Sequence, residues 1–186
     1  MKFNEALLLL NVAVMKEYPD AAFYEAQGYL VPNDSIGVDV DGTIDKDNFK
    51  AVYCKYGEGS TIIAKFKKGS NEVEINLIHE PWLEDIVTTP FISLSAEQAI
   101  EMIAEKCGSD AIGEGPITLR HQLFPGEAEP RYFIGTLANL HTVNVYTGKI
   151  DVPAGNLAVS NEEVIKEQEE CSIYGVLKEI WKKIVG

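Results

Sequence analysis

The sequence is poor in cysteine and has no cysteine spacing that indicates a metal site. Its three cysteines lie far apart, and no C-x-x-C pair occurs among its 186 residues. A structural zinc site needs closely spaced Cys or His ligands, and an odd number of cysteines cannot form a complete disulfide framework. We therefore expect Cys54, Cys107 and Cys171 to be small buried hydrophobic side chains.

Positive charge is also scarce. The chain carries 16 Lys and Arg against 29 Asp and Glu, a formal net charge of −13. A surface this negative repels phosphate groups, so neither nucleic acid nor an anionic membrane is an expected partner. Apolar residues still make up 46% of the chain, which is typical of a globular protein with a buried core. We expect the partner to be a protein or peptide.

No apolar run reaches the roughly 20 residues that a membrane-spanning helix needs. The strongest candidate, Ala6–Val14, is interrupted by an asparagine, and no small-residue cleavage site follows it directly. Leu7, Leu10 and Val14 recur at helical spacing, which favours an amphipathic core helix. If Met1 is the native first residue, we expect a cytoplasmic protein. If a signal peptide was removed ahead of it, we expect an extracytoplasmic one.

Motifs for nucleophilic catalysis and phosphate binding are missing as well. No serine lies in G-x-S-x-G, and no glycine-rich loop fits a phosphate. His79, His121 and His141 are isolated in the sequence. His121 and His141 would form a metal or catalytic pair only if their strands were adjacent, and a strand-surface role is more common. We therefore predict no catalytic residue, no resident cofactor and a protein that is not an enzyme.

The sequence does contain two similar series of predicted elements. The first is a helix at 4–17 with Asn4 as its cap, and the second is a helix that opens with the Ser95-Ala-Glu-Gln98 capping box and closes at Gly108. The first helix precedes an extended segment at 20–31 and alternating runs at 49–56, 61–66 and 73–77; the second precedes runs at 117–123, 131–137, 141–145 and 149–152. The links are too short for parallel crossovers.

These elements predict an α+β fold of two helix-plus-antiparallel-sheet units, with a C-terminal helix packed on them. The expected divisions are 1–89, 90–155 and 156–186. The last helix is indicated by a capping box at Ser160-Asn-Glu-Glu163 and an apolar stripe that ends near Ile184. The shared order of elements also suggests an internal duplication.

Three segments of the second half share a pattern with a known family: Leu94-Ser-Ala-Glu-Gln-Ala99, Arg131-Tyr-Phe-Ile134 and the strand and turn from His141 to Ile150 that contain Thr147-Gly148. On these residues the segment 94–150 resembles the PepSY domain. The resemblance implies a small module in which an antiparallel sheet packs on a helix. It also implies a binding or peptidase-inhibitory role without catalytic residues.

The string Asp39-Val-Asp41-Gly-Thr matches the nucleophile motif of haloacid-dehalogenase-like phosphatases. In a Mg²⁺-dependent phosphohydrolase, Asp39 would attack phosphorus and Asp41 would protonate the leaving group. The context argues against this alternative, because antiparallel runs follow where helices and parallel strands should alternate.

The same stretch matches most of an EF-hand loop, but glycine and asparagine stand where its first and twelfth ligands should be. A low-affinity Ca²⁺ or Mg²⁺ site on Asp39, Asp41, Asp45 and Asp47 is left open. The interpretation that uses every residue is a hairpin with Asp41-Gly42 at its corner. Trp82 and Trp181 are candidate partner-surface residues if both are exposed.

Overall fold

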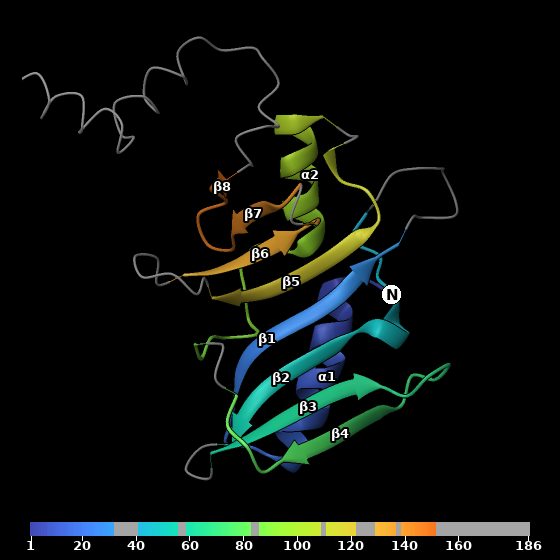
Figure 1. Ribbon diagram of the computed structural model, residues 1–186, viewed down its shortest axis with the longest axis vertical. Coiled ribbons are helices and arrows are strands. Elements are labelled where there is room, and N and C mark those ends of the chain that lie inside the picture. The colour runs from blue at the N-terminus through green and yellow to red at the C-terminus, as the bar shows by residue number, and fades with distance from the viewer. Residues whose placement is uncertain are drawn as a thin grey trace, which may run out of the picture. The chain divides into compact units, whose positions relative to one another are not determined.

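The structure is a computed structural model, and it describes residues 1–31, 41–55, 59–82, 86–108, 111–121, 129–136 and 139–151. Within these residues, eight strands form one antiparallel sheet in the order β4-β3-β2-β1-β5-β6-β7-β8 (Figure 1). The predicted α+β class is therefore confirmed. The elements are α1 (Phe3–Glu17), β1 (Ala21–Leu30), the 3-10 helix η1 (Lys46–Asn48), β2 (Lys50–Lys55), β3 (Ser60–Phe66), β4 (Val73–Ile78), α2 (Ala96–Cys107), β5 (Gly115–His121), β6 (Pro130–Ile134), β7 (His141–Asn144) and β8 (Ile150–Asp151).

The two halves of the chain meet at the centre of the sheet. Strand β1 pairs with β2 along one edge and with β5 along the other, with Ala26 opposite Leu119 and Gly28 opposite Ile117. Gly28 is required at this join, because a Cβ there would lie 2.8 Å from the ring of Phe49. The expectation of two separate helix-and-sheet units is not borne out, since one sheet runs through both halves and Met1–Asn156 forms one compact unit.

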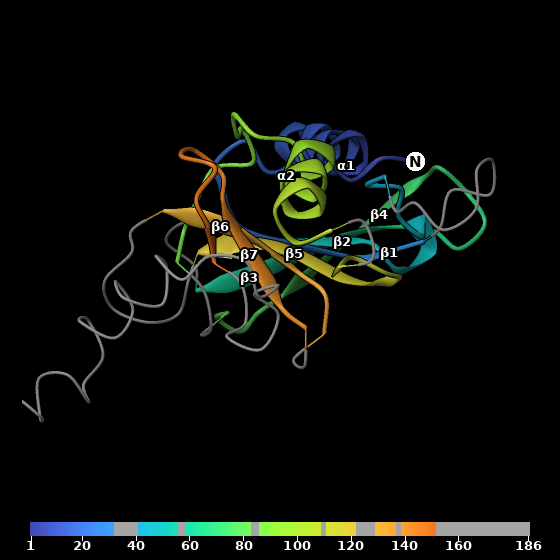
Figure 2. The same cartoon turned by 90° about the horizontal axis from the view of Figure 1, so that it is seen from above.

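Both helices lie on the same face of the sheet (Figure 2). Alternation along the strands turns side chains such as Tyr53, Ile62 and Tyr132 toward them. Phe3 at the start of α1 packs edge-on against Phe49 at a centroid distance of 5.1 Å and against Tyr132 at 5.8 Å. Because Phe49 precedes β2 and Tyr132 lies in β6, this aromatic cluster joins the two halves of the core.

Asn4 was predicted to cap the first helix, and this prediction is wrong. Helix α1 begins at Phe3 with Lys2 as its N-cap, so Asn4 already lies inside the first turn. Its side-chain oxygen instead accepts hydrogen bonds from the backbone N–H of Ala96 at 2.9 Å and from the Tyr132 hydroxyl at 3.3 Å. Asn4 therefore satisfies one of the free N–H groups at the start of α2.

The capping box of the second helix is confirmed. The Ser95 hydroxyl accepts from the N–H of Gln98 at 3.2 Å, and the Gln98 side chain accepts from the N–H of Ser95 at 2.8 Å. Gly108 ends the helix with φ +96°. The predicted C-terminal helix, residues 156–186, lies outside the described residues. In the part of the chain that the structure describes, no helix is both long and apolar enough to span a bilayer.

Candidate functional site

Among the described helices, α1 is the one that exposes large apolar side chains on its outer face. Leu8, Leu9 and Val12 have 54%, 42% and 59% of their surface exposed. Positions i, i+1 and i+4 share one side of a helix, so the three side chains form one patch, which we call the α1 patch. The charged Glu5 and Lys16, both exposed, flank it along the helix.

The α1 patch follows from the run of four leucines at 7–10. Successive helical residues are turned by about 100°, so four adjacent leucines cannot all face the sheet. Leu7 and Leu10 are buried against it, and Leu8 and Leu9 are left on the other side. The spacing of Leu7, Leu10 and Val14 correctly predicted the buried face. The apolar residues between them were the signal for the exposed patch, and it was overlooked.

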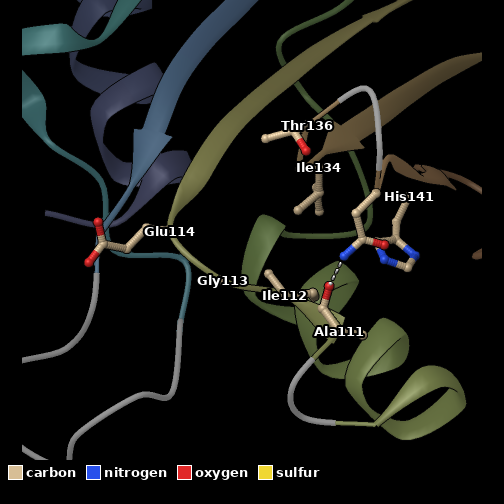
Figure 3. A pocket seen from close by; sticks show the side chains of 9 residues that line it. Ala111, Ile112, Gly113, Glu114, Ile134, Thr136 and His141 are labelled. Carbon is tan, nitrogen blue, oxygen red and sulfur yellow. Dashed lines mark hydrogen bonds between the residues drawn. The ribbon is translucent and has the colours of Figure 1, made fainter. Parts of the chain in front are cut away.

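A second feature is a cavity of about 220 Å³ at one end of the sheet. It lies between the segment after α2 and the connection from β6 to β7 (Figure 3). Apolar side chains and polar groups line it together. The lining residues that the argument uses are Ala111, Ile112, Glu114, Ile134, Asn139 and His141.

His141 is the most unusual group in this cavity. Its side chain is only 1% exposed, and neither ring nitrogen has a hydrogen-bond partner among the described residues. Burial lowers the pKa of His141, and the nearby carbonyl of Ala111 offsets part of this effect. That carbonyl accepts its hydrogen bond from the Asn139 amide at 3.0 Å. His141 is therefore held as a neutral imidazole with unused hydrogen-bonding capacity.

The condition for a metal or catalytic pair of His121 and His141, that their strands be adjacent, is not met. Strand β6 separates β5 from β7, and His121 lies opposite Pro130 whereas His141 lies opposite Ile134. The two imidazoles therefore stand beside opposite ends of β6. His79, the third histidine, is exposed.

Asp41 is held in structural contacts. Its carboxylate pairs with Lys2 at 2.5 Å and accepts from the Thr43 N–H at 3.1 Å and the Thr43 hydroxyl at 2.6 Å. Burial alone would raise the pKa of Asp41, but the bonds from Lys2 and Thr43 outweigh it and lower the pKa to about 2. Gly42 next to it has φ +80°, as its place at a tight turn predicted.

Asp45 and Asp47, two other carboxylates of the candidate cation site, bind different groups. Asp45 accepts from the N–H of Asp47 at 3.0 Å and from the Asn48 amide at 2.6 Å. Asp47 accepts from the N–H of Gly69 at 3.1 Å. No group of three metal-binding side chains occurs among the described residues.

Two sequence predictions in this region fall partly on residues that are not described. Asp39 and the incoming hairpin strand, Val38 to Val40, lie outside the described residues. The outgoing residues Thr43 and Ile44 form isolated bridges with Lys2 and Leu30. The loop after Gly42 thus joins the start of α1 to the end of β1.

The predicted partner-surface and cysteine residues are only partly described. Trp82 is half-buried, and the ammonium of Lys50 lies 5.8 Å from its ring centroid. Cys54 and Cys107 are free thiols that are half-buried rather than fully buried. Trp181 and Cys171 lie outside the described residues.

Comparison with known proteins assigns no family. No family model matches the sequence, and no curated protein matches it. Among solved structures, the chain is similar to the crystal structure of a putative lipoprotein from Clostridium difficile 630. The two share 12% sequence identity with a TM-score of 0.48, and the match covers 77% of this chain and 88% of that chain.

Proposed function

We propose that this protein is a non-catalytic binding or regulatory module that engages another protein or a peptide through the α1 patch. The observation that carries the proposal is the exposure of Leu8, Leu9 and Val12 side by side on one helix. Contiguous apolar surface is costly to leave in water, and on soluble proteins it commonly marks an interaction site. An apolar groove on the partner would cover the three side chains, as in other helix-in-groove complexes.

Charge indicates what kind of partner fits. Two copies of a chain with a net charge of −13 repel each other, so pairing of the patch with itself is disfavoured. An anionic membrane is disfavoured for the same reason. A protein with an apolar groove and a neutral or basic rim would not be repelled by the negative charge of this chain.

The PepSY-like character of the second half is part of this proposal. The order α2, β5, β6, β7, β8 agrees with the helix and antiparallel strands that the resemblance implies. Gly148 has φ +69° in the turn after Thr147, the conformation for which a turn needs glycine. A peptidase-inhibitory role is the most specific form of the proposal, and the internal duplication is a prediction that accompanies it.

The phosphohydrolase alternative gains no support from the contacts of Asp41. A general acid must be free to reach the leaving group, whereas both oxygens of the Asp41 carboxylate are engaged by Lys2 and Thr43. The flanking strands are antiparallel. We therefore propose the binding function alone.

Affinity capture from cells of the native host tests the proposal. Immobilised wild-type protein should retain a specific partner, and Val12→Lys should retain at least tenfold less of it, because a buried unpaired charge opposes docking. Ile78→Lys is the matched control, since it adds the same charge at an exposed apolar residue in β4. Turnover of a generic phosphate ester with Mg²⁺, lost in Asp39→Asn, would instead establish the alternative.

A further inference from the structure

The cavity at His141 has two walls of different chemistry. Ile112 and Ile134 are buried and supply an apolar wall. His141 lies on another side of the cavity (Figure 3). Asn139 also lines the cavity, and its amide donates to the Ala111 carbonyl. A mixed lining with few polar groups is typical of pockets that orient a small ligand.

The unpaired nitrogens of His141 point to a ligand. Buried polar side chains nearly always find hydrogen-bond partners, and each exception calls for an explanation. His141 is 1% exposed, and neither ring nitrogen makes a hydrogen bond of good geometry to a described residue. The Ala111 carbonyl lies close enough to act on the imidazole but donates nothing to it. A group that enters the cavity and bonds to the imidazole would supply what the chain itself does not.

We propose that this cavity binds a small neutral group that both donates and accepts hydrogen bonds, the chemistry of a primary carboxamide, with His141 as its principal hydrogen-bonding partner. A neutral imidazole presents a donor at one nitrogen and an acceptor at the other. A carboxamide carries both an N–H donor and a carbonyl acceptor, so it matches whichever nitrogen faces the cavity. The isoleucine wall accommodates the alkyl part of the ligand.

Charged ligands fit this cavity less well. An anion would meet a neutral imidazole in a chain of net charge −13. Figure 3 shows the Glu114 side chain directed away from His141, so it does not join the imidazole as a ligand for a cation. No set of three metal-binding side chains is found among the described residues.

The size of the cavity limits the ligand to a small molecule or one side chain. A cavity of about 150 Å³ holds benzene, so the 220 Å³ here suits a group of similar or slightly larger size. The carboxamide has two sources, a free small amide or an Asn or Gln side chain of a polypeptide. The inference is independent of the α1 patch, because it concerns α2, β6 and β7.

Titration at about pH 7.5 with isobutyramide, followed through the imidazole NMR signals of His141, tests the proposal. Isobutyrate is the matched probe, because it has the same shape but carries a negative charge. Acetyl-Gly-Gln-Gly-amide represents the side-chain source. We expect saturable shifts with isobutyramide, with the peptide or with both, and at least tenfold weaker binding of isobutyrate.

Three variants test whether the ligand binds in the cavity at His141. Ala111→Leu enlarges a side chain that lines the cavity and keeps His141, so it should abolish the shifts of the His141 signals. His141→Phe should abolish binding in calorimetry, and His79→Phe should leave it unchanged because His79 is exposed elsewhere. Should His141→Phe fail to fold, Ala111→Leu decides. No saturable shift with either amide, equal binding of isobutyrate, or unchanged binding in Ala111→Leu would overturn the proposal and leave a cavity that holds water.

Discussion

Gly42 holds a backbone conformation that residues with a Cβ avoid. Its φ is +80°, and a Cβ there would lie 2.9 Å from the Glu97 Cγ atom. The Glu97 side chain can move, so backbone strain is the larger part of the cost. Gly42→Val should lower the free energy of unfolding by about 1–2 kcal/mol in urea titrations.

The matched control for Gly42 is Gly113. Its φ lies outside the left-handed region, and a Cβ there meets nothing within 4 Å. Gly113→Ala should change the free energy of unfolding by less than about 1 kcal/mol, in the stabilising direction, because it restricts the unfolded chain. Equal destabilisation by the two substitutions would show that the strain at Gly42 is not the cause.

His141 should make stability depend on pH. Burial lowers its pKa in the native state below the ordinary 6.5, so the unfolded chain binds a proton that the native protein does not. The free energy of unfolding should therefore be constant above about pH 6.5 and fall as the pH drops from there through the lowered native pKa. Urea titrations between about pH 7.5 and 5 measure this slope.

His141→Phe removes the titrating imidazole and supplies the comparison. Its free energy of unfolding should depend less on pH in the same range. The pKa of Asp41, lowered to about 2, acts in a separate window: its contribution is full above about pH 3.8 and is lost as the pH falls toward 2. An unchanged slope in His141→Phe would show that other groups cause the pH dependence.

Sequence reasoning reached some of these residues and not others. The need for positive φ at Gly42 followed from the Asp41-Gly42 dipeptide, which is local information. His141 was expected at a strand surface, because its sequence neighbours alternate and nothing local reveals what covers it. Its burial depends on the segment around Ala111, which lies some 30 positions away along the chain and reaches it only after folding.

At the scale of elements, Asn4 links α1 to α2. Its side-chain oxygen accepts from the Ala96 N–H, and the Tyr132 hydroxyl lies within reach of both this oxygen and the Leu94 carbonyl. Asn4→Ala therefore leaves the Ala96 N–H without its side-chain acceptor. We expect a loss of about 1–2 kcal/mol in the free energy of unfolding. Asn76→Ala on the exposed side of β4 should cost less than about 0.5 kcal/mol. Equal losses would contradict the linking role of Asn4.

The loop from Asp41 to Asp47 should be insensitive to divalent cations. Its carboxylates already bind Lys2, Thr43, Asn48 and backbone N–H groups. A cation would have to break these contacts, so we expect millimolar Ca²⁺ or Mg²⁺ to raise the melting temperature by less than about 1 °C. A larger rise that disappears in Asp41→Asn would identify a metal site.

Most elements could be predicted because their signals are local. The alternation of Val73, Ile75 and Leu77 gave β4, and the Ser95 capping box gave the start of α2. Asn4 was misassigned because a side chain that caps its own helix and one that caps a neighbour look alike in sequence. The choice between them depends on where α2 lies in the folded protein.

At the scale of the whole molecule, the pairing of β1 with β5 decides the architecture. The predicted elements were compatible with two separate sheets or with one. The local sequence of a strand does not specify which strand some 90 positions away it will pair with. Gly28 leaves room for the ring of Phe49 over β1, but this is apparent only in the fold. The internal duplication stays a prediction.

The α1 patch is the surface on which the proposed function depends. Placing a photoreactive amino acid at Val12, and in a second sample at Ile78, measures directly which face meets a partner. After irradiation in cells of the native host, we predict a discrete crosslinked protein from position 12 and none from position 78. Crosslinks of equal yield from both positions, or none from position 12, would contradict the account.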